Sequence, residues 1–214
     1  MPVKVSVTEL KRRFDAGLSE EAADFFGHLP ALIKKPLFLE EKKGLSHAEA
    51  GTVLHFVMQR LNYKQNDIES QIADMVARDL LTEQQAQSVD PDKIRRFLES
   101  PLGIRLMASE SVSREVPFNI EIPRHELYRD MQDKAYQGET LLLQGVIDCY
   151  FEEPEGIVLL DYKTDYAPPG KLEILMERYR LQIGYYARAL ELLSGKKVRE
   201  KYIYLFWNGD VLEF

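Results

Sequence analysis

The chain has 214 residues, of which 45% are hydrophobic, and a formal net charge of −7. This length and composition allow one sizeable buried core and predict one domain. The acidic balance argues against an autonomous, tight DNA binder, because DNA affinity depends mainly on Lys and Arg side chains that neutralise phosphates.

The sequence also indicates where the protein works. No run approaches eighteen apolar residues, and Met1–Ser6 lack the apolar stretch of a signal peptide. The single cysteine, Cys149, excludes an intramolecular disulfide and alternates away from Asp148, so we expect it to fill core space. A soluble, cytoplasmic protein without a membrane partner is therefore expected.

The first half of the chain, residues 1–110, is predicted to be mainly helical. Ser6 and Ser46 each stand three residues before a glutamate, which is the capping-box pattern of a helix start. Apolar residues recur at helical spacing between Ile68 and Leu80. Asp90-Pro91 then supplies an N-cap and a first-turn proline for another helix.

The second half, residues 111–214, changes to the period of β-strands. One strand, one hairpin, one long helix and a second hairpin are predicted. The strands are expected at Glu115–Ile122, Leu141–Glu152, Ile157–Thr164, Glu200–Trp207 and Val211–Phe214, and the helix at Lys171–Leu193. The order of elements is thus α, β, β, β, α, β.

The first hairpin carries the most informative residues. If Pro154 and Glu155 alone form its loop, Asp148 lies opposite Asp161 and Val146 opposite Lys163, all on one face. A glycine bulge just after the loop would shift the register by one residue and separate the two aspartates. Carboxylates held this close repel unless a cation such as Mg²⁺ or Mn²⁺ lies between them. The alternative is a solvated strand end with a surface ion pair.

Five segments together resemble the RecB-type branch of the PD-(D/E)XK nuclease superfamily, and within it the nuclease domains of AddA-type helicase-nuclease proteins. They are Gly51-Thr52-x-x-His55, Arg114-Glu115-Val116-Pro117-Phe118, Gly145-Val146-Ile147-Asp148, Asp161-Tyr162-Lys163-Thr164 and Gln182-x-x-x-Tyr186. The resemblance implies an α/β (α+β) fold with a restriction-endonuclease-like core, in which helices flank a mixed sheet. It further implies that residues 1–214 form one nuclease domain excised from a larger helicase-nuclease.

The resemblance also assigns roles to residues. It implies that His55, Asp148, Asp161 and the backbone carbonyl of Tyr162 hold a metal ion, whereas the helical context of His55 alone favours a core or boundary histidine. Lys163 would orient the attacking water. Three residues at helical spacing would border the site, and two others are accessory candidates. The resemblance places Gln182 and Tyr186 at the border of the site, and Arg178 extends their stripe by its helical spacing alone. All three could instead be a polar helix edge, and the accessory candidates are Glu115 and Thr164.

Glu115 has an alternative role, because it could pair with Arg114 or Arg105 instead of approaching the metal.

The implied activity is Mg²⁺-dependent, exodeoxyribonuclease-type hydrolysis of single-stranded DNA in double-strand-break repair, with Mn²⁺ as a substitute. The implied partners are DNA, the helicase region of the parent polypeptide and an AddB-like subunit. No G-x-x-x-x-G-K-[ST] loop occurs, so this chain is not expected to bind ATP, and one cysteine cannot supply a four-cysteine iron-sulfur site. The alternatives are a catalytically silent docking module and a free-standing exonuclease.

Overall fold

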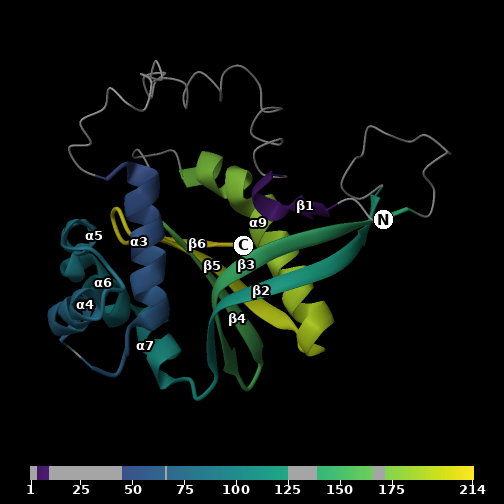
Figure 1. Cartoon of the computed structure of the whole chain (residues 1–214). Coiled ribbons are helices and arrows are strands. Elements are labelled where there is room, and N and C mark those ends of the chain that lie inside the picture. Colours follow the sequence, from purple (N-terminus) through teal and green to yellow (C-terminus); the bar gives the residue numbers. More distant parts are fainter. Residues whose placement is uncertain (1–3, 10–44, 66, 125–138, 166–171) are drawn as a thin grey trace, which may run out of the picture.

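The computed structural model describes residues 4–9, 45–65, 67–124, 139–165 and 172–214 (Figure 1). Its helices are α3 (His47–Arg60), α4 (Ile68–Ala77), α5 (Glu83–Gln87), α6 (Pro91–Glu99), α7 (Pro101–Ala108) and α9 (Leu172–Ser194). Its strands are β1 (Lys4–Ser6), β2 (Val112–Pro123), β3 (Thr140–Glu153), β4 (Gly156–Lys163), β5 (Val198–Leu205) and β6 (Val211–Glu213). In Figure 1, α3 to α7 gather to one side of the sheet and α9 crosses it.

The described strands form one six-stranded sheet in the order β1-β3-β4-β5-β6, with β2 paired to β3. The β3/β4 and β5/β6 pairs are antiparallel, whereas β4 and β5 run parallel. The α+β fold with a mixed central sheet flanked by helices is therefore confirmed. No helix in the described part of the chain combines the length and the apolarity needed to cross a membrane.

The helix starts follow the predicted caps. Ser46 and Glu49 form a complete capping box at α3, and Asp90 caps α6 with Pro91 in its first turn. Ser6 accepts a hydrogen bond from the backbone N–H of Glu9 at 3.1 Å, as the cap pattern predicts. The strand β1 immediately before it was not predicted, because three residues carry too short an alternation to be recognised.

The β3/β4 hairpin has the unshifted register. Backbone pairing runs from Glu153 and Gly156 to Cys149 and Leu160, so only Pro154 and Glu155 lie between the paired residues. Gly156 has φ +141°, and a Cβ there would lie 2.6 Å from the carbonyl oxygen of Lys197. The glycine therefore permits a close approach of the chain after α9 and does not introduce a register-shifting bulge.

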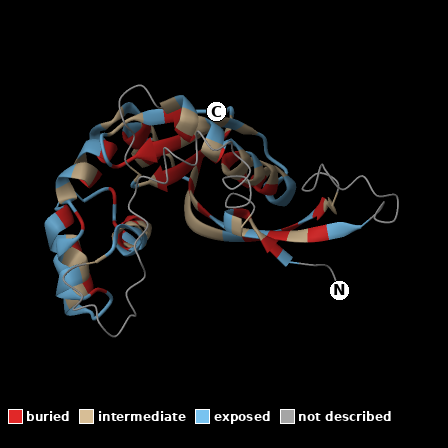
Figure 2. Ribbon diagram, turned by 90° about the horizontal axis from the view of Figure 1, so that it is seen from above, coloured by how far each residue is buried: buried red, intermediate tan, exposed pale blue. Residues whose placement is uncertain are grey.

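Two hydrophobic cores lie on opposite faces of the sheet. On β4, Val158, Leu160 and Tyr162 belong to the core shared with α3 to α7, whereas Ile157 and Leu159 belong to the core under α9. Figure 2 shows the buried residues concentrated on the central strands and on the inner sides of the helices. A strand buried on both faces explains the continuous apolar run before Asp161 in β4.

β3 changes core at one residue. Leu143 and Ile147 lie in the α9 core, but Cys149 and Phe151, which have the same alternation, lie in the α3 core. The change falls at Asp148, and β2 has an irregularity at the facing position, where Glu115 adopts φ +50°. Strong local twist therefore brings this part of the sheet between α3 and α9.

Candidate active site

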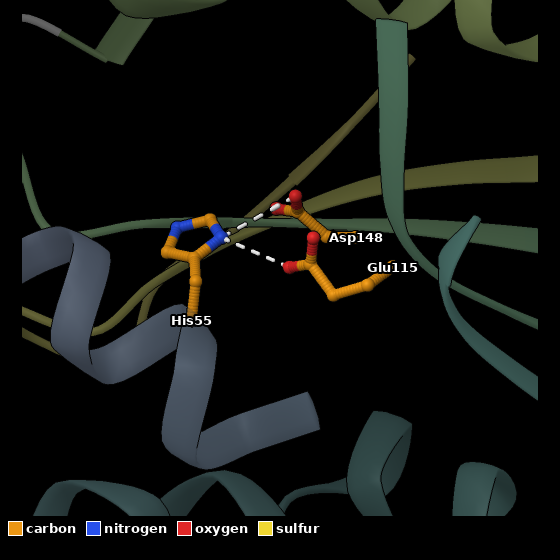
Figure 3. Close-up of side chains that lie close together, drawn as sticks. All are labelled: His55, Glu115 and Asp148. Carbon is orange, nitrogen blue, oxygen red and sulfur yellow. Dashed lines mark ion pairs between the residues drawn. The ribbon is translucent and has the colours of Figure 1, made fainter. Parts of the chain in front are cut away.

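Side chains from α3, β2 and β3 converge at the twist (Figure 3). His55 Nδ1 lies 3.3 Å from Asp148 Oδ1 and 3.9 Å from Glu115 Oε1. One potential ligand atom from each of the three residues lies within 4.8 Å of the others. This spacing matches a shared ion better than three separate surface groups, because one imidazole cannot neutralise two carboxylates.

The position of His55 depends on a glycine one turn earlier. A Cβ at Gly51 would lie 3.1 Å from Thr164 Oγ1, so the absence of a side chain lets α3 approach the end of β4. This contact gives a physical reason for the Gly-Thr-x-x-His spacing and places Thr164 against the helix. The exposed side chain of Thr164 therefore borders α3.

The other end of α3 is held by a residue whose role was not predicted. Arg114 Nη1 donates hydrogen bonds to the carbonyl oxygens of Met58 at 3.1 Å and Leu61 at 2.6 Å, and its guanidinium lies over the Tyr63 ring. A cation at a helix C-terminus compensates the unpaired carbonyl groups and the helix dipole. Arg114 thus links β2 directly to the helix that carries His55.

Asp148 has a backbone partner as well as the histidine. Its Oδ2 accepts a hydrogen bond from the Tyr162 N–H at 2.8 Å. The described β3/β4 pairing stops at Cys149 and Leu160, so the expected direct pairings of Asp148 with Asp161 and of Val146 with Lys163 are not formed. The carboxylate takes the place of a backbone acceptor, which separates the two strands where the site lies.

Asp161 lies in the adjoining, more buried part of the site. It is 1% exposed and forms an ion pair with Lys163 through Oδ2, although no described group donates a hydrogen bond of normal geometry to that oxygen. Gln182 Nε2 donates to Asp161 Oδ1 at 3.2 Å and to Tyr186 Oη at 3.0 Å. The predicted stripe on the long helix therefore contacts the site at Gln182 and, through it, at Tyr186.

The two aspartates differ in their protonation. Burial raises the pKa of Asp161 to about 7, against the opposing charge of Lys163. Burial would also raise the pKa of Asp148, but the hydrogen bond and charge of His55 hold that pKa below its ordinary value. Burial and the Asp148 charge raise the pKa of Glu115. Crowded carboxylates with divergent pKa values are typical of functional sites.

The pKa values of the two bases of the site, Lys163 and His55, are both raised. Burial would lower the pKa of Lys163, but the charges of Asp161 and Asp148 raise it above its ordinary value. Burial would likewise lower the pKa of His55, and its hydrogen bond with Asp148 raises it instead. The Lys163 ammonium therefore partly balances the neighbouring carboxyl groups, with which it forms an ion pair at Asp161.

The residues present fit a divalent ion. They offer carboxylate oxygens and one imidazole nitrogen, and the buried Asp161 Oδ2 has spare acceptor capacity. Such oxygen-rich sets suit Mg²⁺ and Mn²⁺, and the imidazole suits Mn²⁺ better. The converging group shares His55 and Asp148 with the predicted ligand set. It also contains Glu115, whereas Asp161 lies outside it in an ion pair with Lys163.

Two predicted residues, Glu115 and Arg178, lie differently from the simplest expectation. Glu115 faces His55 and pairs with neither candidate arginine among the described contacts. Arg105 instead pairs with Glu153 and Glu200, and Arg114 binds backbone carbonyls. Arg178 lies 3.8 Å from Asp165, so it extends the stripe away from the group formed by His55, Glu115 and Asp148. Asp165 also accepts a hydrogen bond from Tyr179 Oη at 2.8 Å.

Comparison with known proteins agrees with this geometry. Residues 29–210 match the family model of the PD-(D/E)XK nuclease superfamily. The chain is 69% identical over 214 residues to a protein of Acetivibrio thermocellus named as an ATP-dependent helicase/nuclease subunit, and 53% identical over 213 residues to the protein of the same name from Ruminiclostridium cellulolyticum. Both alignments cover 100% of this chain and 17% of the relative, so the chain spans less than a fifth of the length of these relatives. The chain belongs to the PD-(D/E)XK nuclease superfamily.

Proposed function

We propose that this chain is the nuclease domain of an ATP-dependent helicase-nuclease and hydrolyses DNA phosphodiester bonds, chiefly in single-stranded DNA, during double-strand-break repair and recombination. The observation that carries the proposal is the convergence of His55, Glu115 and Asp148 beside the Asp161–Lys163 pair. Membership of a nuclease superfamily and the names of the similar relatives support it.

The metal would be Mg²⁺, with Mn²⁺ as a substitute, held by His55, Asp148, Asp161 and the backbone carbonyl of Tyr162, with Glu115 as a further ligand. When bound, such an ion polarises the scissile phosphate and lowers the pKa of a bound water. Asp148 also holds the Tyr162 peptide through its N–H, and this contact would orient the neighbouring carbonyl.

Lys163 would act as a cation. Its raised pKa keeps the ammonium protonated at neutral pH, so it would orient the water and offset charge that develops on the phosphate, instead of accepting the proton. Gln182 would keep Asp161 in place by its hydrogen bond, and Tyr186 would support Gln182. Both residues are positioning residues in this scheme.

The acidic composition fits a domain that receives DNA from a motor. A net charge of −7 gives little long-range attraction for DNA. The proposed partners are therefore the helicase region of the parent polypeptide and an AddB-like subunit, and the proposed compartment is the cytoplasm. Weak cleavage by the isolated chain follows from the same charge.

The test is cleavage of an end-labelled single-stranded oligonucleotide in Mg²⁺, Mn²⁺ or excess EDTA. We expect weak cleavage that requires either metal and is lost in Asp161→Asn and Lys163→Met. Glu177→Gln serves as the matched control, because Glu177 is an exposed carboxylate of α9 paired only with Arg180 among the described residues. Equal cleavage in EDTA, or wild-type rates in Asp161→Asn, would refute the proposal.

A further inference from the structure

The one tryptophan of the chain is unusually exposed. Trp207 keeps 50% of its surface accessible and lies in the turn between β5 and β6, the two strands labelled in Figure 1. Large aromatic side chains bury extensive apolar area in folded proteins, so an indole left half exposed marks a contact surface more often than a smaller apolar side chain does.

The turn lies beside the strand of the candidate site. The backbone N–H of Phe206 donates to the carbonyl oxygen of Lys163 at 2.8 Å, and the Phe206 ring lies 5.6 Å from that of Tyr162. Trp207 is the next residue along the chain. Because β4 and β5 are parallel, Lys163 and Trp207 leave the sheet at the same end.

Two cations of α6 face this turn. Lys93 Nζ lies 5.3 Å from the centroid of the Trp207 ring. The Arg96 side chain packs on the turn, since its Cδ would be 3.1 Å from a Cβ built on Gly209. Within the described part of the chain, neither cation forms an ion pair, whereas Arg95 between them is paired with Asp92 and Glu69.

The turn itself is well held. Gly209 adopts φ +85°, its N–H donates to the carbonyl oxygen of Leu205 at 2.8 Å, and the Leu205 N–H donates to the carbonyl oxygen of Asp210 at 2.9 Å. These backbone hydrogen bonds hold the turn from which the indole projects. An aromatic ring held in this way loses little conformational entropy when a planar ligand stacks on it.

An accessible aromatic ring with adjacent cations is the combination that binds single-stranded nucleic acid, because bases stack on the ring and phosphates pair with the cations. We propose that Trp207, Lys93 and Arg96 form a stacking site for one base of the single strand that passes the active site. This proposal rests on the proposed nuclease function, which identifies the bound strand as single-stranded DNA. Bases of duplex DNA are stacked on each other, so the site selects single strands.

The sole tryptophan allows a direct measurement. In EDTA, titration with a (dT)16 oligonucleotide is expected to quench the intrinsic fluorescence saturably. The double variant Lys93→Glu/Arg96→Glu should raise the dissociation constant for (dT)16 at least tenfold. Lys197→Glu is the control for a single charge reversal, because Lys197 is exposed just before the opposite end of β5. Lys197→Glu should raise the dissociation constant by less than about threefold.

Variants of the indole complete the test, with binding followed by the anisotropy of labelled (dT)16. Trp207→Ala should bind about 5- to 100-fold more weakly, the range expected for the loss of one stacked base, and Trp207→Phe should recover most of the affinity. Absence of binding, binding without quenching, equal quenching by a duplex, or unchanged affinity of Trp207→Ala would each overturn the stacking site.

These experiments distinguish failure of the nuclease proposal from failure of the stacking site. The titrations contain no metal, and quenching should persist in Asp161→Asn. If the wild-type chain quenches but never cleaves in Mn²⁺, the stacking site stands and the nuclease proposal fails. If it cleaves without quenching, only the stacking site is wrong.

Discussion

Removal of Lys163 should destabilise the metal-free protein more than removal of Asp161. Both side chains are largely shielded, with 14% and 1% exposed, and they form an ion pair. Lys163→Met leaves the buried Asp161, whose pKa is about 7, without its cation, so above that pH the unpaired carboxylate should cost about 3 to 5 kcal/mol. Asp161→Asn leaves Lys163 near Asp148 and Asp165, so a smaller loss of about 1 to 3 kcal/mol is expected.

The double variant Asp161→Asn/Lys163→Met should be less destabilised than the sum of the single changes, because it leaves no unpaired member of the pair. Urea unfolding in EDTA, followed by circular dichroism, measures all four free energies of unfolding. For Lys163→Met, the midpoint should fall by about 1 to 2.5 M urea if the slope is about 2 to 3 kcal/mol per M. Additive effects, with no coupling between the two positions, would refute the ion-pair reasoning.

Metal adds a second criterion to the same experiment. Mn²⁺ should raise the unfolding midpoint of Lys163→Met, because binding to the folded state alone stabilises it and the carboxylates remain. It should raise the midpoint of Asp161→Asn much less. Equal stabilisation of the two variants by Mn²⁺ would contradict the placement of Asp161 in the metal site.

The remaining predictions concern pH, the histidine and the link to α3. Because burial raises the pKa of Asp161 to about 7, a proton must leave before it binds metal, so Mn²⁺ affinity should rise between about pH 6 and pH 8; a flat calorimetric profile would contradict this. The same raised pKa makes the metal-free protein lose stability as pH increases from about 4 to about 7, since the folded state holds the proton more tightly than the unfolded state, and urea midpoints across this range measure it. His55→Ala should lower Mn²⁺ affinity at least tenfold, with cleavage partly restored at high Mn²⁺; unchanged affinity would exclude it as a ligand. Arg114→Lys should cost about 1 to 2 kcal/mol in urea unfolding, because lysine keeps the charge but not the two-carbonyl contact, and a neutral result would show that this contact does not hold α3.

The hairpin shows what sequence patterns could predict. The apolar strands and the turn residues predicted the hairpin and left two registers open, one with a two-residue loop before Gly156 and one shifted by a glycine bulge, and the structure has the first. The capped starts of α3 and α6 were predictable for a similar reason, because each cap is a local hydrogen bond between residues close in sequence. Hydrogen bonds between residues close in sequence can therefore be predicted without knowledge of the fold.

The details of the site depended on tertiary structure. Glu115 adopts a left-handed backbone conformation, which the sequence does not indicate because the residue is not a glycine. In this conformation its carboxylate faces His55 and not Arg105 or Arg114. Strict alternation placed Asp148 directly opposite Asp161, but the Asp148 side chain accepts the Tyr162 N–H and ends the pairing. The contact between Gly51 and Thr164 joins segments more than a hundred residues apart, so spacing along the chain could not reveal it.

Calorimetric titration with Mn²⁺ tests the metal site most directly, because it does not require DNA, the helicase region or turnover. The wild-type chain should bind Mn²⁺ saturably, Asp148→Asn should lose most of this binding, and Glu177→Gln should match the wild type. Wild-type affinity in Asp148→Asn would show that the ion, if bound, lies elsewhere and that the residues converging on His55 are not a metal centre.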